Sequence, residues 1–183
     1  MASVKIYAEH RDILDVLITS GKVSSVAGGT KTGPFREQRD AYVFAAAIGL
    51  AMQNPTPESR MPKAKKQDTP IRDVVFVGAA GAREVCLTAS LLDERDEESL
   101  EQSLNRQLKL IAETELAEQF ELLDRYAHAG FSWLAKRQED ESSVRDLILA
   151  AIDQIERVES AITDTSSVHD PLLDMLDIGD MQL

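Results

Sequence analysis

Histidines and carboxylates are the residues whose spacing comes closest to a catalytic or metal-binding pattern. The chain has three histidines, His10, His128 and His169, which are far apart in the sequence. Asp124 precedes His128 by four residues, so the two side chains would share one face of a helix and could share a proton or a metal ion. A hydrogen bond at the surface is the simpler interpretation, and we favour it. No metal site and no cofactor is therefore predicted.

Two glycine-rich segments match phosphate-binding loops only in part. Residues 78–83 (Gly-Ala-Ala-Gly-Ala-Arg) follow an apolar run, but their spacing is not GxGxxG and no alternation of strands and helices follows. Residues 28–33 contain Gly, Thr and Lys, but glycine does not directly precede the lysine, as the pattern GxxxxGK[ST] requires. We interpret the first segment as the entry to a helix and the second as a loop.

The remaining reactive groups do not form a catalytic set. Cys86 is flanked by Val85 and Leu87 on a predicted helix, which indicates a buried structural thiol rather than a nucleophile. Residues 10–12 (His-Arg-Asp) copy a tripeptide of protein-kinase catalytic loops, but no glycine loop or metal-binding companion precedes them. Because no nucleophile, base and orienting group are visible together, no catalytic residue is predicted and an enzyme is the least favoured class.

Composition predicts a globular, cytoplasmic protein. The 183 residues are 43% hydrophobic and 28% charged, with 32 acidic and 20 basic side chains and a net charge of −12. A single cysteine cannot form an intrachain disulfide or a cysteine-rich zinc site, and no apolar run reaches the roughly 18 to 20 residues of a membrane span. The acidic charge opposes nonspecific attraction to DNA or to anionic lipid.

Charge is divided unevenly along the chain. Residues 1–75 contain 11 basic and 8 acidic side chains, whereas residues 76–183 contain 9 and 24. A proline-rich stretch at 54–72 carries several basic groups without apolar periodicity, which predicts an exposed loop. Solvated charge is the simpler interpretation of this loop. Direct DNA binding is the alternative, and it would use Arg60, Lys63, Lys65 and Lys66.

The spacing of apolar residues predicts an all-α bundle of about five or six helices with at most one short strand or hairpin. Residues 35–52 are apolar almost all round, which places that helix inside the core. Residues 74–77 (Val-Val-Phe-Val) are the one predicted strand. Further helices are expected at about 8–20, where Gly21 would end the helix, at 79–92, over 100–134 as one long or two consecutive helices with a weak point at Gly130, and after Ser143, which can cap the last helix.

The last 24 residues differ from the helical domain that we predict for residues 1–159. Residues 160–183 contain five Asp and no Lys or Arg, which predicts an acidic tail. Five apolar side chains in this tail lie on a segment too short to fold alone, so we expect the segment to dock either on its own domain or in the groove of a partner. They are Leu172, Leu173, Met175, Leu176 and Ile178.

Two segments resemble the small proteins associated with bacterial DNA phosphorothioation (Dnd) systems. Residues 35–50, FREQRDAYVFAAAIGL, resemble an F-x3-RD-x2-x-FAAA-x-G segment of that family. Residues 118–131, EQFELLDRYAHAGF, resemble its helix with a Phe-Glu…Tyr-Ala-x-Gly-Gly-like end, although Ala129 replaces the first glycine. The resemblance implies a bacterial accessory protein that works beside ATP-driven machinery for DNA modification or restriction in phage defence.

We therefore predict a non-enzymatic adaptor that binds a larger ATPase or nuclease of a defence system. Its acidic surface would suit a basic, DNA-handling partner, and DNA contact would be indirect. No membrane partner is predicted, and a homo-oligomer is left open. Besides the tail, the residues expected to bind the partner or to shape the common structure are Phe35, Arg36, Arg39, Asp40, Tyr126 and Gly130. An acidic DNA mimic that displaces DNA from an enzyme is a further alternative.

Overall fold

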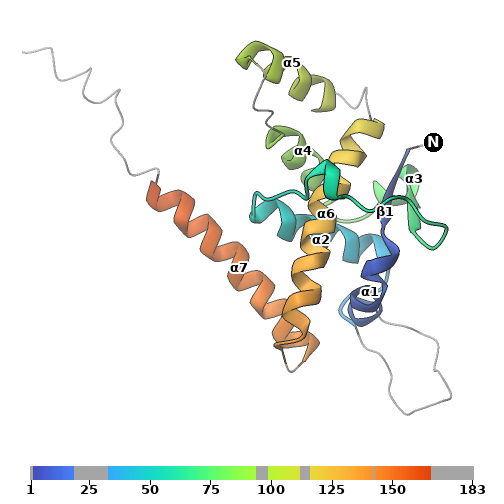
Figure 1. Cartoon of the computed structure of the whole chain (residues 1–183). Coiled ribbons are helices and arrows are strands. Elements are labelled where there is room, and N and C mark those ends of the chain that lie inside the picture. Colours follow the sequence, from blue (N-terminus) through green and yellow to red (C-terminus); the bar gives the residue numbers. More distant parts are fainter. Residues whose placement is uncertain (1, 19–32, 94–98, 112–115, 142, 166–183) are drawn as a thin grey trace, which may run out of the picture.

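The computed structural model describes residues 2–18, 33–93, 99–111, 116–141 and 143–165 (Figure 1). Within these residues the protein has seven α-helices and one two-stranded sheet, which confirms the all-α prediction. In chain order the elements are β1 (Ser3–Ile6), the 3-10 turn η1 (Ala8–His10), α1 (Arg11–Leu17), α2 (Gln38–Ala51), the 3-10 turn η2 (Glu58–Arg60), β2 (Thr69–Arg72), α3 (Asp73–Phe76), α4 (Ala82–Leu91), α5 (Leu100–Ile111), α6 (Leu116–Gln138) and α7 (Val144–Thr165).

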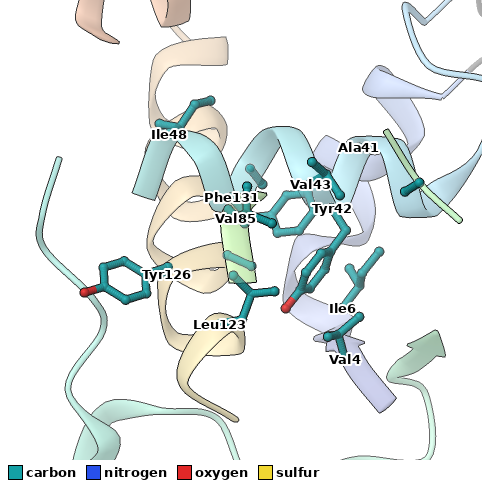
Figure 2. Close-up of a cluster of buried hydrophobic side chains, with 14 of the residues drawn as sticks. Val4, Ile6, Ala41, Tyr42, Val43, Ile48, Val85, Leu123, Tyr126 and Phe131 are labelled. Atoms are coloured by element: carbon teal, nitrogen blue, oxygen red, sulfur yellow. The ribbon is translucent and has the colours of Figure 1, made fainter. Parts of the chain in front are cut away.

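Helices α2 and α6 cross at the centre of the molecule and provide most of its core (Figure 1). Eight of the 14 residues of α2 are buried, as expected for a helix that is apolar almost all round. Figure 2 shows Tyr42 of α2 packed near Val4 and Ile6 of β1 and near Leu123 of α6. The apolar stripe predicted for α6 is buried against α2, and it includes Phe120, Leu123, Ala127, Phe131 and Leu134.

The crossing of α2 and α6 depends on one glycine in each helix. A Cβ atom at Gly49 would overlap the backbone carbonyl of Tyr126, and a Cβ atom at Gly130 would overlap the backbone carbonyl of Ala45. Helix α6 runs without interruption through Gly130, so the prediction of a weak point there is wrong. Gly130 is instead the position at which the two backbones approach too closely for any side chain.

The sheet joins the N-terminus to the end of the basic, proline-rich stretch. β1 and β2 are antiparallel, with Val4 opposite Ile71 and Lys5 opposite Pro70. The strand predicted at residues 74–77 is wrong, because Asp73–Phe76 form the short helix α3. The backbone N–H of Val77 donates to the carbonyl of Asp73 at 3.0 Å, which closes a helical turn over these residues.

The predicted helix ends are confirmed at two positions. Gly81, with φ of 78°, immediately precedes α4, so residues 78–81 are the entry to a helix. Ser143 Oγ accepts a hydrogen bond from the backbone N–H of Asp146 at 3.2 Å and thereby caps α7. Residues 100–138 contain two helices, α5 and α6, rather than one. The prediction that the first helix ends at Gly21 is wrong, because α1 ends at Leu17 and Ile18 is extended and forms a β-bridge with Phe35. Gly21 itself lies outside the described residues.

The packing of α4 and α7 completes the core. Cys86 is 8% exposed on the inner face of α4, which confirms the prediction of a buried thiol. Leu147 and Ala151 of α7 are buried against α2 and α6. None of the described helices has both the length and the apolar character needed to span a membrane.

Candidate functional site

The predicted partner-binding residues near the start of α2 have different surroundings. Phe35 is half-buried, and its ring centroid lies 5.2 Å from that of Phe44. Arg39 links α2 to α3, because its guanidinium pairs with Glu37 at 2.9 Å and donates a hydrogen bond to the carbonyl of Val75 at 3.0 Å. Arg36 is exposed and Asp40 is half-buried. Of these side chains, Arg36 is the one most open to a partner.

The other predicted partner-binding residues lie in the core or outside the described part of the chain. Tyr126 of α6 is 2% exposed, and Figure 2 shows that its ring points away from Tyr42 of α2. Its backbone forms the contact with Gly49, which is a structural role. The apolar side chains of the acidic tail, Leu172, Leu173, Met175, Leu176 and Ile178, lie outside the described residues.

The basic stretch at 54–72 is exposed but is tied to the rest of the domain. The four basic side chains considered for DNA binding, Arg60, Lys63, Lys65 and Lys66, all face solvent. One end is held by Thr56, whose backbone N–H donates to the carbonyl of Arg125 at 3.1 Å. Near the other end, the Asp68 carboxylate accepts hydrogen bonds from the backbone N–H groups of Ala8 at 2.9 Å and Lys65 at 2.6 Å. The stretch therefore has a fixed path over α6 and the N-terminus.

The predicted hydrogen bond between Asp124 and His128 is wrong, because each side chain has other partners. Asp124 is 4% exposed, and its Oδ1 accepts hydrogen bonds from Tyr42 Oη at 2.6 Å and from the backbone N–H of Lys5 at 2.8 Å. Burial raises the pKa of Asp124 to about 7, although both hydrogen bonds favour the charged form. Asp124 is a polar link between β1, α2 and α6.

His128 instead belongs to a cluster with Glu9 and His10. Its Nε2 and Glu9 Oε1 lie 2.7 Å apart, and its Nδ1 lies 2.9 Å from the hydroxyl oxygen of Thr56. The His10 and His128 rings meet edge to face, with centroids 4.7 Å apart. Glu9 and His10 come from η1, whereas His128 comes from the middle of α6. The fold thus joins groups that are 119 residues apart in the sequence.

His10 is buried with an unsatisfied nitrogen. The side chain stacks on Phe131, with ring centroids 5.2 Å apart, and the residue is 4% exposed. Its Nε2 has no hydrogen-bond partner among the described residues. Burial and then the neighbouring His128 lower the pKa of His10 to about 4, so the imidazole is neutral at neutral pH.

Glu9, His10 and His128 together can hold a metal ion. One ligand atom from each residue lies within 4.8 Å of the other two. Two imidazoles and one carboxylate are a common ligand set for zinc and related transition metals. Sequence reasoning missed this cluster because its two parts are distant in the chain, and because the spacing of Asp124 and His128 indicated a different pair. The adjacency of Glu9 and His10 was the only local signal.

A second feature that sequence reasoning missed is the exposed apolar face of α5. Leu100, Leu104 and Leu108 are 79%, 50% and 62% exposed, and their spacing places them on one side of the helix. We call them the leucine stripe. The same spacing predicted an amphipathic helix, but it did not indicate which face is covered.

Two polar side chains of α5, Arg106 and Gln107, attach the helix to the domain. Arg106 pairs with the Asp93 carboxylate and also donates a hydrogen bond to the Asp93 carbonyl at 2.8 Å. Gln107 Nε2 donates to the carbonyl of Leu91 at 3.1 Å. Figure 1 shows α5 at one end of the molecule next to α4. Arg106 and Gln107 thus attach the helix, while the leucine stripe faces solvent.

Comparison with known families identifies a helical protein linked to DNA sulphur modification. The model of the family described as DNA sulphur modification system-associated protein 4 matches residues 20–169. The chain belongs to this family, which confirms the resemblance to Dnd-associated proteins. The family is associated with a DNA sulphur modification system and is not a known enzyme family. Searches of curated proteins and of solved structures gave no significant match.

Proposed function

We propose that this chain is a non-enzymatic adaptor of a bacterial DNA sulphur modification system that acts in phage defence. It binds a larger protein of that system, an ATPase or a nuclease. Membership of the family supports the link to the system. The observation that carries the adaptor role is the leucine stripe of α5.

The orientation of α5 supports partner binding. An amphipathic helix at a protein surface normally turns its apolar face toward the core. In α5 the leucine stripe is exposed instead, and Arg106, which is two positions from both Leu104 and Leu108, lies on the side opposite to them and contacts the domain. Exposed leucines at i, i+4 and i+8 are the anchors with which a helix enters an apolar groove of a partner. Covering this stripe would remove apolar surface from water.

The proposal is tested by co-purification from cells that express the whole modification system. Tagged chain is compared with a Leu104→Ala/Leu108→Ala variant, which removes apolar surface while keeping the high helix propensity of α5. An Asn105→Ala/Lys109→Ala variant is the matched control, because both residues are exposed and each follows a mutated leucine by one position, about 100° further round the helix. Retention of an ATPase or nuclease of the system by the control, and its loss from the leucine variant, is the expected result. Equal retention by both variants would contradict a role for the stripe.

A further inference from the structure

The strongest unexplained feature of the molecule is the unsatisfied nitrogen of buried His10. Buried polar atoms almost always have a partner, and an exception calls for a missing water, ion or functional reason. His10 Nε2 lies 4.0 Å from Glu9 Oε1, too far for a hydrogen bond, and no other described group reaches it. Stacking on Phe131 fixes the orientation of the His10 ring and therefore that of its Nε2 atom.

The donor atoms around His10 are close to the spacing that a metal ion needs. An ion that is bound tetrahedrally at about 2.0 to 2.1 Å from each donor holds its ligand atoms about 3.3 Å apart. Glu9 Oε1 is 2.7 Å from His128 Nε2 and 4.0 Å from His10 Nε2. The Glu9 side chain is 47% exposed, so it has room to rotate, which can lengthen the shorter of these two distances and shorten the longer. The same exposure gives an ion a path from solvent.

The hydrogen bond between His128 Nδ1 and Thr56 also fits a metal ion bound at His128 Nε2. With Nε2 on a metal, the neutral imidazole carries its proton on Nδ1, which then donates to the hydroxyl oxygen of Thr56 at 2.9 Å. Thr56 is itself fixed, because its carbonyl accepts a hydrogen bond from Arg125 Nε at 3.0 Å and its N–H donates to the Arg125 carbonyl. The second partner of a metal-binding histidine is thus already in place.

We infer that Glu9, His10 and His128 form a binding site for a divalent transition-metal ion of the zinc type. The three residues supply one carboxylate oxygen and two imidazole nitrogens, and a water or another ligand completes the coordination. The ion would join η1 to the middle of α6. This inference does not depend on the adaptor proposal, since the cluster comes from elements other than α5.

The test uses the untagged, full-length chain, freed of metal by a chelator and titrated calorimetrically with Zn²⁺ in excess Mg²⁺. The Mg²⁺ occupies adventitious carboxylate sites on this acidic protein but competes poorly for imidazole. We expect one Zn²⁺ per chain. Glu9→Gln and His128→Gln should each weaken Zn²⁺ binding at least ten-fold. Thr56→Ala, which removes only the group behind His128, should weaken it about ten-fold.

His169→Gln is the control, because it removes the remaining histidine of the chain and leaves the cluster intact. It should bind Zn²⁺ as the unmodified chain does. Circular dichroism establishes that each variant is folded, and His10 is left unchanged because its burial makes misfolding a risk. Zn²⁺ should also raise the unfolding temperature of the unmodified chain but not that of Glu9→Gln. Absence of Zn²⁺ binding to the folded chain, or equal binding by Glu9→Gln, would overturn the inference. A water molecule bound to His10 Nε2 would then account for the unsatisfied nitrogen.

Discussion

Gly49 of α2 and Gly130 of α6 lie at one helix crossing, and each glycine faces a backbone carbonyl of the other helix. The carbonyl that Gly49 faces belongs to Tyr126, four residues before Gly130, and the one that Gly130 faces belongs to Ala45, four residues before Gly49. Both glycines fall in the segments that carry the resemblance to the Dnd-associated family. Those segments therefore describe how the core is packed rather than a catalytic motif.

We predict that Gly49→Ala and Gly130→Ala each destabilise the protein. In an isolated helix, glycine to alanine is stabilising by about 1 kcal/mol. At this crossing the new methyl group must push two backbones apart, and such overpacking costs about 1 to 3 kcal/mol or more. Urea unfolding measures the net loss of unfolding free energy. Because both changes force the same helices apart, the double variant should lose less than the two single variants added together. Two stabilised single variants would contradict this account.

Asp124 should make stability depend on pH. Its pKa is about 7 in the folded protein and 3.8 when unperturbed, so between about pH 4 and pH 7 the folded state binds more protons than the unfolded state. The free energy of unfolding therefore falls as pH rises across this window, by up to about 4 kcal/mol from this group, and is level above it. Asp124→Asn keeps an oxygen that accepts both hydrogen bonds but cannot ionise. Urea unfolding from pH 4 to pH 8 should show a weaker decline for the variant than for the unmodified chain, and parallel profiles would contradict the prediction.

Removal of the Tyr42 hydroxyl should weaken the hydrogen bonding of Asp124 that joins β1, α2 and α6. Among the described residues, Tyr42→Phe leaves the backbone N–H of Lys5 as the one donor to Asp124 Oδ1. A buried acceptor that loses a donor costs about 1 to 3 kcal/mol. Because the Tyr42 hydrogen bond lowers the pKa of Asp124, its loss should raise that pKa further. NMR titration of the Asp124 carboxyl carbon follows this change directly, and an unchanged or lower midpoint would argue against the hydrogen bond.

The basic stretch distinguishes the adaptor proposal from direct DNA binding. Arg60, Lys63, Lys65 and Lys66 are exposed on a segment with a fixed path, so replacing all four with Gln should leave the fold intact. On the adaptor proposal, this variant retains the partner protein as the unmodified chain does. Direct DNA binding would instead give a steep dependence on salt that the variant loses. Fluorescence anisotropy with duplex DNA at several salt concentrations separates the two outcomes.

The parts of the fold that follow a local period could be predicted from the sequence. The burial of α2 and the stripe of α6 follow from their apolar spacing, and the cap of α7 follows from Ser143. The two strands could not be predicted in the same way, because β2 is four residues long, contains Pro70 and pairs with β1, which is distant in the sequence near the N-terminus. Residues 74–77 have the composition of a strand, but they have no strand beside them, and Asp73 starts a helical turn.

The candidate sites depend on long-range packing, which a single sequence does not reveal. The apolar period of α5 is visible in the sequence, but the hydrogen bonds that attach Arg106 to Asp93 and Gln107 to Leu91 are not. The cluster of Glu9, His10 and His128 exists only because η1 packs against the middle of α6. No local pattern links these two segments.

The affinity of the purified chain for the ATPase or nuclease that co-purifies with it tests the central claim most directly. Binding is measured by calorimetry for the unmodified chain, the Leu104→Ala/Leu108→Ala variant and the Asn105→Ala/Lys109→Ala variant. Truncating two buried anchors at an interface typically costs about 1 to 2 kcal/mol each, so the leucine variant should bind at least ten-fold more weakly while the control binds normally. Equal affinities for all three chains would contradict the claim that the leucine stripe of α5 binds the partner.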